Sequence, residues 1–427
     1  MVLANQSWFE PTSGRRVFHV RWLLTSADPP RHNVLVETSD GIVEAIHSAP
    51  QSAVGNALPV VVVPPLVNVH THLEFSSLPA PLGPRESFTD WIRNVVAWRH
   101  QQTEPLQSAL QAGLRESANA GVVAIGDIAT SDAVVPWEPS AELSGGPQHL
   151  IRFREVLGLG DARIADQLQG LGRHLEANCA AGIVPAVSPH APYSVHPDLL
   201  NAAVGLAVSH SVPLTMHLAE TPAELQLLRD GNGPFAEMLQ QLGAWRGDVF
   251  TGDYNIRYCL EQLARCSRAL AVHGNYFTTA DLHFLAANPH VATVYCPRTH
   301  AWFQHTPHCW KVLRKLGGRV VLGTDGRSSN PDLSIWKELQ LVARQAPELP
   351  ADQLIPMVTT DAADALGLPR EDFTIAIGRP FCATVIESRD LAANDTDCIR
   401  LSQTGKPIAV IRDGRCITAM SQANWRC

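Results

Sequence analysis

The residues best suited to chemistry in this sequence are histidines and one aspartate that follow short apolar runs. His70 and His72 close the run that begins at Leu66, and residues two apart in a strand point to the same side. Two imidazoles at one strand end suit a metal ion, although a two-histidine pattern by itself also arises by chance. Later apolar runs end in further side chains of the same kind, namely His190, His217, His273 and Asp325.

Eight apolar runs of strand length must position these residues, and helix-like segments separate them. Eight β-then-α units over about 300 residues match the count and length of a TIM barrel, whose sites lie at the carboxyl ends of the strands. A doubly wound open sheet is the alternative, because strand count alone does not close a barrel. The eight predicted strands are Leu66–His70, Val122–Ile128, Ile151–Leu157, Ile183–Val187, Pro213–His217, Leu270–His273, Val291–Tyr295 and Arg319–Leu322.

The two ends of the chain differ from the alternating middle. Asp40-Gly41 lies between two alternating apolar runs, which is a good hairpin signal. The sequence therefore predicts a small β-sandwich domain from residues 1–63 and 366–427, and a (β/α)8 barrel over residues 64–365. The terminal strands are expected at Val17–Leu24, Val34–Thr38, Ile42–Ile46, Ala383–Ile386 and Ile408–Ile411. In the barrel, helices are expected within Asp90–Ala120, Asp161–Ala180 and Pro197–His210, and a lid over Gly231–Asn255.

The composition limits the classes of partner. A formal charge of −8 and the lack of Lys/Arg runs argue against nucleic acid, and a small-molecule substrate is expected. No apolar run approaches the roughly 20 residues that a membrane span needs, and no signal peptide is visible at the N-terminus. Nine cysteines without a CxxC pair favour a reduced, cytoplasmic setting. A homodimer is compatible with these features.

Six motifs resemble those of the amidohydrolase superfamily. The resemblance covers essentially the whole chain. It is strongest to the aminohydrolase branch, which includes S-adenosylhomocysteine/methylthioadenosine deaminases, chlorohydrolases and aminodeoxyfutalosine deaminases. The matching stretches are LVNVHTHLE (66–74), SPHAPYSV (188–195), HLAET (217–221), VHGNY (272–276), CPRTH (296–300) and GTDGRSSN (323–330).

The resemblance implies one divalent metal per chain. Three imidazoles and one carboxylate suit Zn²⁺, with Fe²⁺ as the alternative, and one position stays open for water. Two-metal relatives carry a carboxylated lysine on the fourth strand, where this chain has Ser188-Pro189-His190. A single metal follows, and His190 becomes a substrate contact. The implied ligands are His70, His72, His217 and Asp325.

The resemblance also implies how protons move. Glu220 shuttles a proton from the attacking water to a ring nitrogen, and His273 orients that water without binding the metal. Asp325 accepts the second proton and passes it to the leaving group. Together with the metal ligands, these residues form the predicted catalytic set.

Weaker candidates for substrate contacts have ordinary structural alternatives. Glu74 follows the first two histidines and could bind sugar hydroxyls or form a surface salt bridge. Arg298 and Arg327 follow the seventh and eighth strands, and either could pair with a substrate carboxylate or be a loop arginine. Trp302 could stack on a base or belong to the core. The cluster His300, His305 and His308 is interpreted as a polar loop rather than as a second metal site.

Two departures from the family pattern affect details. Gly326 stands where many relatives have Ser after the metal-binding Asp. The C-terminal signature appears as the degraded IAIGRPFCA (375–383), which concerns only the small domain.

The function predicted from these residues is hydrolytic deamination of an amino-substituted purine, an adenine nucleoside such as aminodeoxyfutalosine. One of the two arginines would then pair with the carboxylate of that substrate. Loss of chloride or cleavage of an amide on a heterocycle is the first alternative, because these reactions use the same metal platform. A non-catalytic scaffold of the same fold is the alternative from another class.

Overall fold

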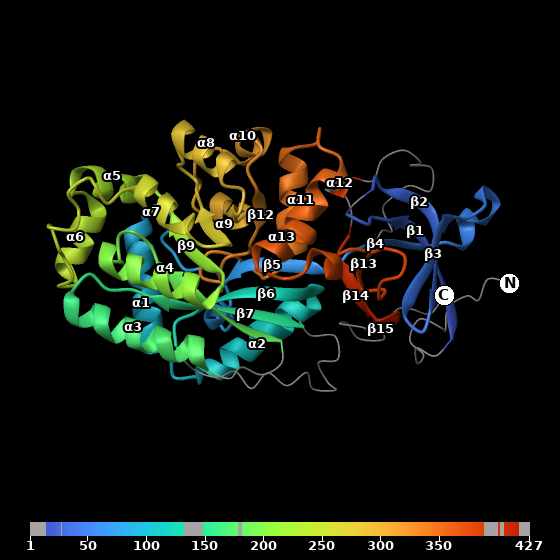
Figure 1. The fold of residues 1–427 in the computed structure, drawn as a ribbon, viewed down its shortest axis with the longest axis horizontal. Coiled ribbons are helices and arrows are strands. Elements are labelled where there is room, and N and C mark those ends of the chain that lie inside the picture. The colour runs from blue at the N-terminus through green and yellow to red at the C-terminus, as the bar shows by residue number, and fades with distance from the viewer. Residues whose placement is uncertain are drawn as a thin grey trace.

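The main feature of the computed structural model, which describes residues 14–26, 28–131, 148–177, 182–387, 400–401 and 405–417, is a barrel of parallel strands (Figure 1). Its eight strands neighbour one another in sequence order, from β5 to β12. The strands are β5 (Leu66–Thr71), β6 (Val122–Ala129), β7 (His149–Val156), β8 (Ile183–Pro189), β9 (Leu214–Leu218), β10 (Ala269–His273), β11 (Val291–Tyr295) and β12 (Val320–Leu322).

The first and last strands meet and nearly close the barrel. The backbone N–H groups of Thr324 and Asp325 both donate to the carbonyl of His70, at 3.1 Å each. Gly323 allows this approach, because a Cβ there would lie 2.8 Å from the Cβ of His70. The predicted barrel fold is confirmed, and every predicted barrel strand agrees with an observed strand to within two residues at each end.

Apolar side chains fill the inside of the barrel. They come from alternate positions on every barrel strand except β9, so they share one face. Leu366 joins the same cluster from the segment after α13 (Thr360–Ala365). His217 of β9 pairs with Val272 in the ladder, so its imidazole faces the same interior at the carboxyl end.

Helices surround the barrel, and the structure adds detail to two of the predicted segments. The predicted segment Asp90–Ala120 is two helices, because Pro105 starts a new helix after a break. The predicted lid Gly231–Asn255 contains a helix, α6, whose Phe235 stacks on Tyr193 at 4.2 Å between ring centroids. The other helices are α1 (Phe88–Gln101), α2 (Leu106–Asn119), α3 (Asp161–Glu176), α4 (Pro197–His210), α5 (Pro222–Asp230), α6 (Pro234–Gln241), α7 (Ile256–Leu263), α8 (Thr279–Ala287), α9 (Pro297–Trp302), α10 (Trp310–Lys315), α11 (Ile335–Gln345) and α12 (Ala351–Leu354).

A second sheet combines strands from both parts of the chain that flank the barrel, at the right of Figure 1. It is one seven-stranded sheet in the order β15-β14-β13-β4-β1-β2-β3. Its two edges approach each other, because Ile42 bridges Pro380 and Gly41 touches the Asp413 turn. The sheet thus folds over its own apolar core. Its strands are β1 (Arg15–Leu23), β2 (Arg31–Ser39), β3 (Ile42–Ser48), β4 (Leu58–Val63), β13 (Ala383–Glu387), β14 (Pro407–Arg412) and β15 (Arg415–Ile417).

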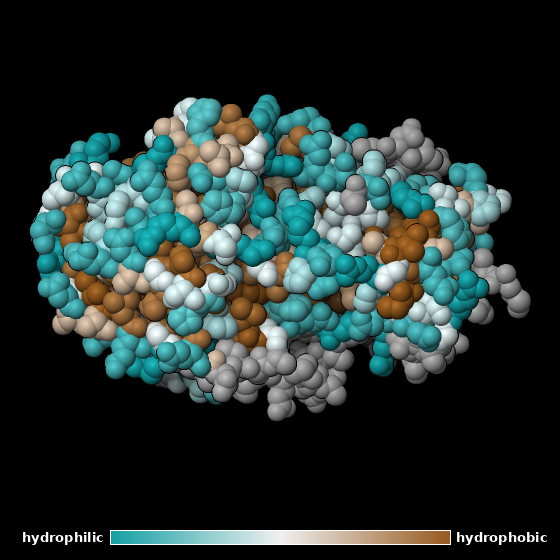
Figure 2. Space-filling view, viewed as in Figure 1, coloured by the Kyte–Doolittle hydropathy of each residue, from teal (hydrophilic) through white to brown (hydrophobic). Residues whose placement is uncertain are grey.

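The surface in Figure 2 is hydrophilic over most of the face shown, with hydrophobic residues in several separate groups. Within the described part of the chain, no helix combines the length and the hydropathy needed to cross a bilayer. The cysteines Cys259, Cys266, Cys296, Cys309, Cys382 and Cys416 are all free thiols.

Candidate metal centre

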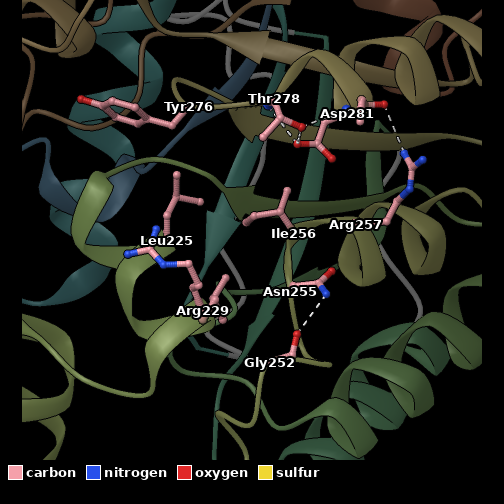
Figure 3. A pocket seen from close by; sticks show the side chains of 11 residues that line it. Leu225, Arg229, Gly252, Asn255, Ile256, Arg257, Tyr276, Thr278 and Asp281 are labelled. Carbon is pink, nitrogen blue, oxygen red and sulfur yellow. Dashed lines mark hydrogen bonds between the residues drawn. The ribbon is translucent and has the colours of Figure 1, made fainter.

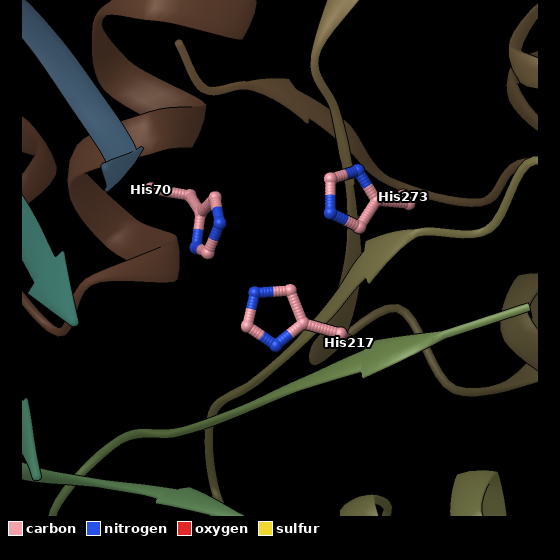
Figure 4. A group of neighbouring side chains, drawn as sticks. All are labelled: His70, His217 and His273. Atoms are coloured by element: carbon pink, nitrogen blue, oxygen red, sulfur yellow. The ribbon is translucent and has the colours of Figure 1, made fainter. Parts of the chain in front are cut away.

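Histidines from three strands converge at the carboxyl end of the barrel. In Figure 4 the rings of His70, His217 and His273 point toward a common centre. One nitrogen from each ring lies within 4.8 Å of the others, and the same holds for single ligand atoms of His70, His72 and Asp325. All five side chains are buried. The structure therefore brings together every residue that was predicted to bind the metal, and places His273 beside them.

Two of these residues have a backbone conformation that is unfavourable for their type. His273 has φ 68° and Asp325 has φ 57°, both in the left-handed region. Non-glycine residues at such angles cost roughly 1–3 kcal/mol each and occur at functional sites that the surrounding structure holds in place. The strain turns both side chains toward the shared centre where their strands end.

His217 is oriented by the backbone of the neighbouring strand end. Its Nδ1–H donates to the carbonyl of His190 at 2.8 Å, and its backbone N–H donates to the same oxygen at 2.9 Å. This bond fixes the tautomer and leaves Nε2 free as a ligand. Burial, with His70 and His190 nearby, lowers the pKa of His217 to about 3, so the ring is neutral as a metal ligand must be.

The donor set fits a divalent cation. Both ring nitrogens of His70 and Nδ1 of His72 are buried without a hydrogen-bond partner among the described residues. Asp325 Oδ1 lies 3.6 Å from His70 Nε2 and 3.4 Å from His72 Nε2. Its other oxygen, Oδ2, accepts a hydrogen bond from Ser329 Oγ at 2.5 Å. Burial opposes ionisation of Asp325, but the surrounding imidazoles outweigh it and hold the pKa of that carboxyl well below its usual range.

Glu220 lies at the edge of the same centre. Its Oε1 is 3.3 Å from His273 Nε2, and its side chain is 7% exposed. Burial raises the pKa of Glu220 well above its usual range, and the nearby carboxylates of Asp325 and Glu224 add to the effect. A buried carboxyl whose pKa is shifted upward in this way suits a group that takes up and releases protons.

Two predicted substrate contacts lie beside the centre. His190 follows β8, its Nδ1 shares a 2.6 Å hydrogen bond with Ser194 Oγ, and its ring lies 5.2 Å from that of His217. The carboxylate of Glu74 accepts hydrogen bonds from Arg99 at 2.6 Å and from Thr130 at 3.2 Å. Each carboxylate oxygen retains a lone pair for a further donor, so the sugar-binding role of Glu74 stays a prediction.

The two predicted carboxylate clamps are already paired within the protein. Arg298 binds both oxygens of Asp332, at 2.7 and 3.1 Å. Arg327 donates to Glu116 at 2.8 Å and to the carbonyl of Leu78 at 2.7 Å. These bonds hold the loops after β11 and β12, so the structure gives no support to a substrate-binding role for either arginine.

Arg298 also lies beside a fully buried acid, Glu338, whose pKa burial raises to about 8 despite the nearby guanidinium. Glu338 is 0% exposed, lies 3.7 Å from the guanidinium of Arg298 and accepts the backbone N–H of that residue at 2.8 Å. Arg298→Ala is expected to lower the free energy of unfolding by about 1–3 kcal/mol, because it removes the only cation beside buried Glu338 that the described residues supply at this contact, while Asp332 keeps Lys337. Denaturant melts measure the loss. Adding Glu338→Gln should restore part of it, and a variant as stable as the wild type would contradict the pairing.

Trp302, the remaining predicted contact, ends α9, and the guanidinium of Arg85 lies 5.9 Å from its ring centroid. Its stacking on a base stays a prediction.

Sequence reasoning missed the role of His308. Its Nδ1 accepts the backbone N–H of Trp310 at 2.9 Å, so its Nε2–H donates to the carbonyl of His273 at 2.7 Å. His308 thus holds the backbone of His273, which has a left-handed φ. His300 and His305 bind Thr306 and Tyr276 instead, and neither metal-type group found among the described residues includes this cluster.

The structure explains Gly326, which departs from the family pattern. A Cβ at this position would lie 3.0 Å from the Cβ of His72 and 3.0 Å from the ring of Phe75. Contacts this short would force the neighbouring side chains to shift. Glycine therefore permits the packing of Phe75 against His72.

A pocket of about 450 Å³ lies away from these residues, between α5, the start of α7 and the segment before α8 (Figure 3). Leu225, Arg229, Ile256, Tyr276 and Asp281 are among its lining residues, and none of the predicted site residues is. The chemistry is therefore to be sought at the histidine centre, not in this pocket.

Comparison with known proteins agrees with this site. The model of the Amidohydrolase family matches residues 61–417. The aminodeoxyfutalosine deaminase of Deinococcus radiodurans is 27% identical over 303 residues, which cover 68% of this chain and 69% of that protein. The 5-methylthioadenosine/S-adenosylhomocysteine deaminase of Pyrococcus furiosus is 25% identical over 355 residues, which cover 79% of this chain and 78% of that protein.

A solved structure supports the fold. The crystal structure of Helicobacter pylori aminofutalosine deaminase aligns with a TM-score of 0.74 at 19% identity, and the alignment covers 94% of this chain and 100% of that chain. At this identity the likeness bears on the barrel and its companion sheet, while the chemistry rests on the residues described above.

Proposed function

Because this chain belongs to the amidohydrolase family, we propose that it is a metal-dependent deaminase that releases ammonia from the purine ring of an adenine nucleoside. The observation that carries the proposal is the position of Glu220. Its carboxyl lies 3.3 Å from His273, at the edge of a centre of three histidines and one aspartate. A deaminase needs this combination, because attack on the ring requires a nucleophile and protonation of the adjacent ring nitrogen.

We propose Zn²⁺ as the ion, with Fe²⁺ as the alternative, held by His70, His72, His217 and Asp325. Neutral imidazoles with one carboxylate are the donors that zinc prefers in hydrolytic sites. When bound, such an ion lowers the pKa of a water molecule toward neutrality and so makes a nucleophile available. His273 is left to orient that water, because its Nε2 faces Glu220.

The side chains of the centre then move two protons. Glu220 takes the first proton from the attacking water and gives it to the ring nitrogen next to the carbon under attack. Asp325 takes the second proton and passes it to the departing amino group, which leaves as ammonia. The bond that forms joins the water oxygen to the ring carbon, and the bond that breaks joins this carbon to the amino nitrogen.

The names of the two relatives suggest which nucleosides to test. Aminodeoxyfutalosine, 5′-methylthioadenosine and S-adenosylhomocysteine share an adenine and differ beyond the ribose. Arg298 and Arg327 are already paired within the protein. The predicted carboxylate clamp therefore gives no reason to prefer aminodeoxyfutalosine over the other two nucleosides.

A screen of ammonia release tests the proposal. Zinc-loaded protein should release ammonia from at least one of these nucleosides or from adenosine. A 6-chloropurine nucleoside in the same screen tests chloride as the leaving group. Release of chloride without release of ammonia from any adenine nucleoside would reject the deaminase and favour a chlorohydrolase.

A further inference from the structure

Glu224 makes an unusual contact with the backbone that carries Glu220. It lies in the first turn of α5, where Thr221 is the N-cap and accepts the N–H of Glu224 at 3.2 Å. In a capping box, a glutamate at this position reaches back to the N–H of the cap residue itself. Here its carboxylate passes Thr221 and accepts the N–H groups of Ala219 at 3.0 Å and Glu220 at 2.8 Å.

The peptide units that Glu224 holds are strained and buried. Ala219 has φ 50°, a left-handed conformation at the point where the chain leaves β9. A non-glycine residue keeps such an angle only where its surroundings impose it. Glu224 is 1% exposed, and both of its oxygens face these two amides, so its carboxylate imposes the turn.

Asn275 holds the next peptide unit along the chain. Its Nδ2 donates to the carbonyl of Glu220 at 3.0 Å, and the next backbone N–H, of Tyr276, donates to the carbonyl of Ala219 at 3.0 Å. Asn275 follows His273 by two residues and is 7% exposed. The N–H and the carbonyl of Glu220 are therefore each bound by a buried side chain, the first from the start of α5 and the second from the loop after β10.

We infer that Glu224 is a positioning residue, which acts with Asn275 to fix the backbone of Glu220 so that its carboxyl faces His273. The inference rests on the proposed function for the catalytic role of Glu220. It adds that the geometry of this proton carrier is set by a second carboxylate, which does not itself reach the reacting atoms. Small displacements of a catalytic group lower turnover steeply, by roughly 10²-fold per ångström.

Glu224→Gln tests the inference, because the amide keeps the size but places an N–H₂ group against one backbone N–H. Hydrogen exchange should show that the amides of Ala219 and Glu220 lose protection, while β9 and β10 stay protected. The kcat should fall by about 10–100-fold with little change in KM or metal content. Asn275→Ala, which frees the Glu220 carbonyl, should lower kcat in the same way. It is the replacement test variant if Glu224→Gln does not fold.

Asp281→Asn is the matched control. Asp281 occupies the same helix position in α8 and forms an ordinary capping box with Thr278. The Asp281→Asn variant should lose protection from hydrogen exchange at the start of α8 but keep the kcat of the wild type. A double-mutant cycle completes the test: in a Glu220→Gln background, Glu224→Gln should add little further loss, because both act through one group.

Three results would overturn the inference. The first is that the amides of residues 219–220 stay protected from hydrogen exchange in Glu224→Gln. The second is that Glu224→Gln loses no more kcat than Asp281→Asn does. The third is that the losses of Glu220→Gln and Glu224→Gln add up in the double-mutant cycle. The exchange measurement needs no substrate. If the wild-type protein deaminates no nucleoside, the proposed function fails, while the exchange result still decides whether Glu224 fixes this backbone.

Discussion

Replacing Glu220 with glutamine should leave the metal bound and lower turnover by about 10²–10⁴-fold or more, the usual cost of removing a general acid or base. Glutamine keeps the shape of the side chain but cannot accept a proton from water and pass it on. Metal binding should survive, because Glu220 is outside the proposed ligand set and contacts His273 instead. Steady-state kinetics and elemental analysis on the same preparation measure the two effects together.

The control for this variant is Glu237→Gln on α6, which makes the same chemical change at an exposed position. Its kinetics should match those of the wild type. Near-normal turnover of Glu220→Gln on the true substrate would contradict the proton-transfer mechanism. Loss of metal from that variant would show instead that Glu220 supports the ligands directly.

Replacing His217 with alanine should remove most of the metal and, with it, the activity. The carbonyl of His190 accepts the ring Nδ1–H and the backbone N–H of His217, so Nε2 is presented ready for binding. Changes to groups that merely orient a ligand weaken metal affinity by about 10–100-fold. Loss of the ligand itself should exceed that range. Elemental analysis after dialysis, and competition with a chelator, measure the change.

His210→Ala on α4 removes an exposed histidine and should retain the metal. A second ligand variant, Asp325→Asn, keeps the side-chain size and removes the charge, so it separates loss of binding from loss of fold. Wild-type occupancy in His217→Ala would mean that the strand-end assignment of this ligand is wrong.

The sequence was most informative about the barrel, because alternation of apolar strands and helices is a local signal that repeats eight times. Its strand ends could be placed within two residues because polar and turn residues follow each apolar run. Pro105 also marks the break between α1 and α2, but the amphipathic pattern on both sides masked it. The helix α6 escaped prediction because it is short and lies in a segment rich in Gly.

The sequence predicted the part of the site in which a strand is followed directly by a histidine or an aspartate. Convergence of His70, His72, His217 and Asp325 follows from parallel strands whose carboxyl ends share one edge. Side-chain pairing between distant loops does not follow from sequence spacing. Arg298 and Arg327 follow the seventh and eighth barrel strands, at the edge where the proposed metal ligands lie, yet Asp332 and Glu116 already bind them.

Backbone conformation was the second feature that the sequence could not supply. The residue types of Ala219, His273 and Asp325 do not identify these positions as left-handed, because the surrounding fold imposes the positive φ. The supporting bonds from Glu224, Asn275 and His308 come from helices and loops after the strands. Their roles can be recognised only in the folded structure, where these side chains lie against the backbones that they bind.

Deamination measured against metal content tests the central claim most directly. Metal-free protein, titrated with Zn²⁺ and assayed for loss of adenine absorbance on the nucleoside that the screen selects, should gain activity linearly. The gain should stop at about one metal per chain, because a single set of four ligands is proposed. Activity that survives complete removal of metal, or that needs two metals per chain, would contradict a mononuclear metal-dependent deaminase.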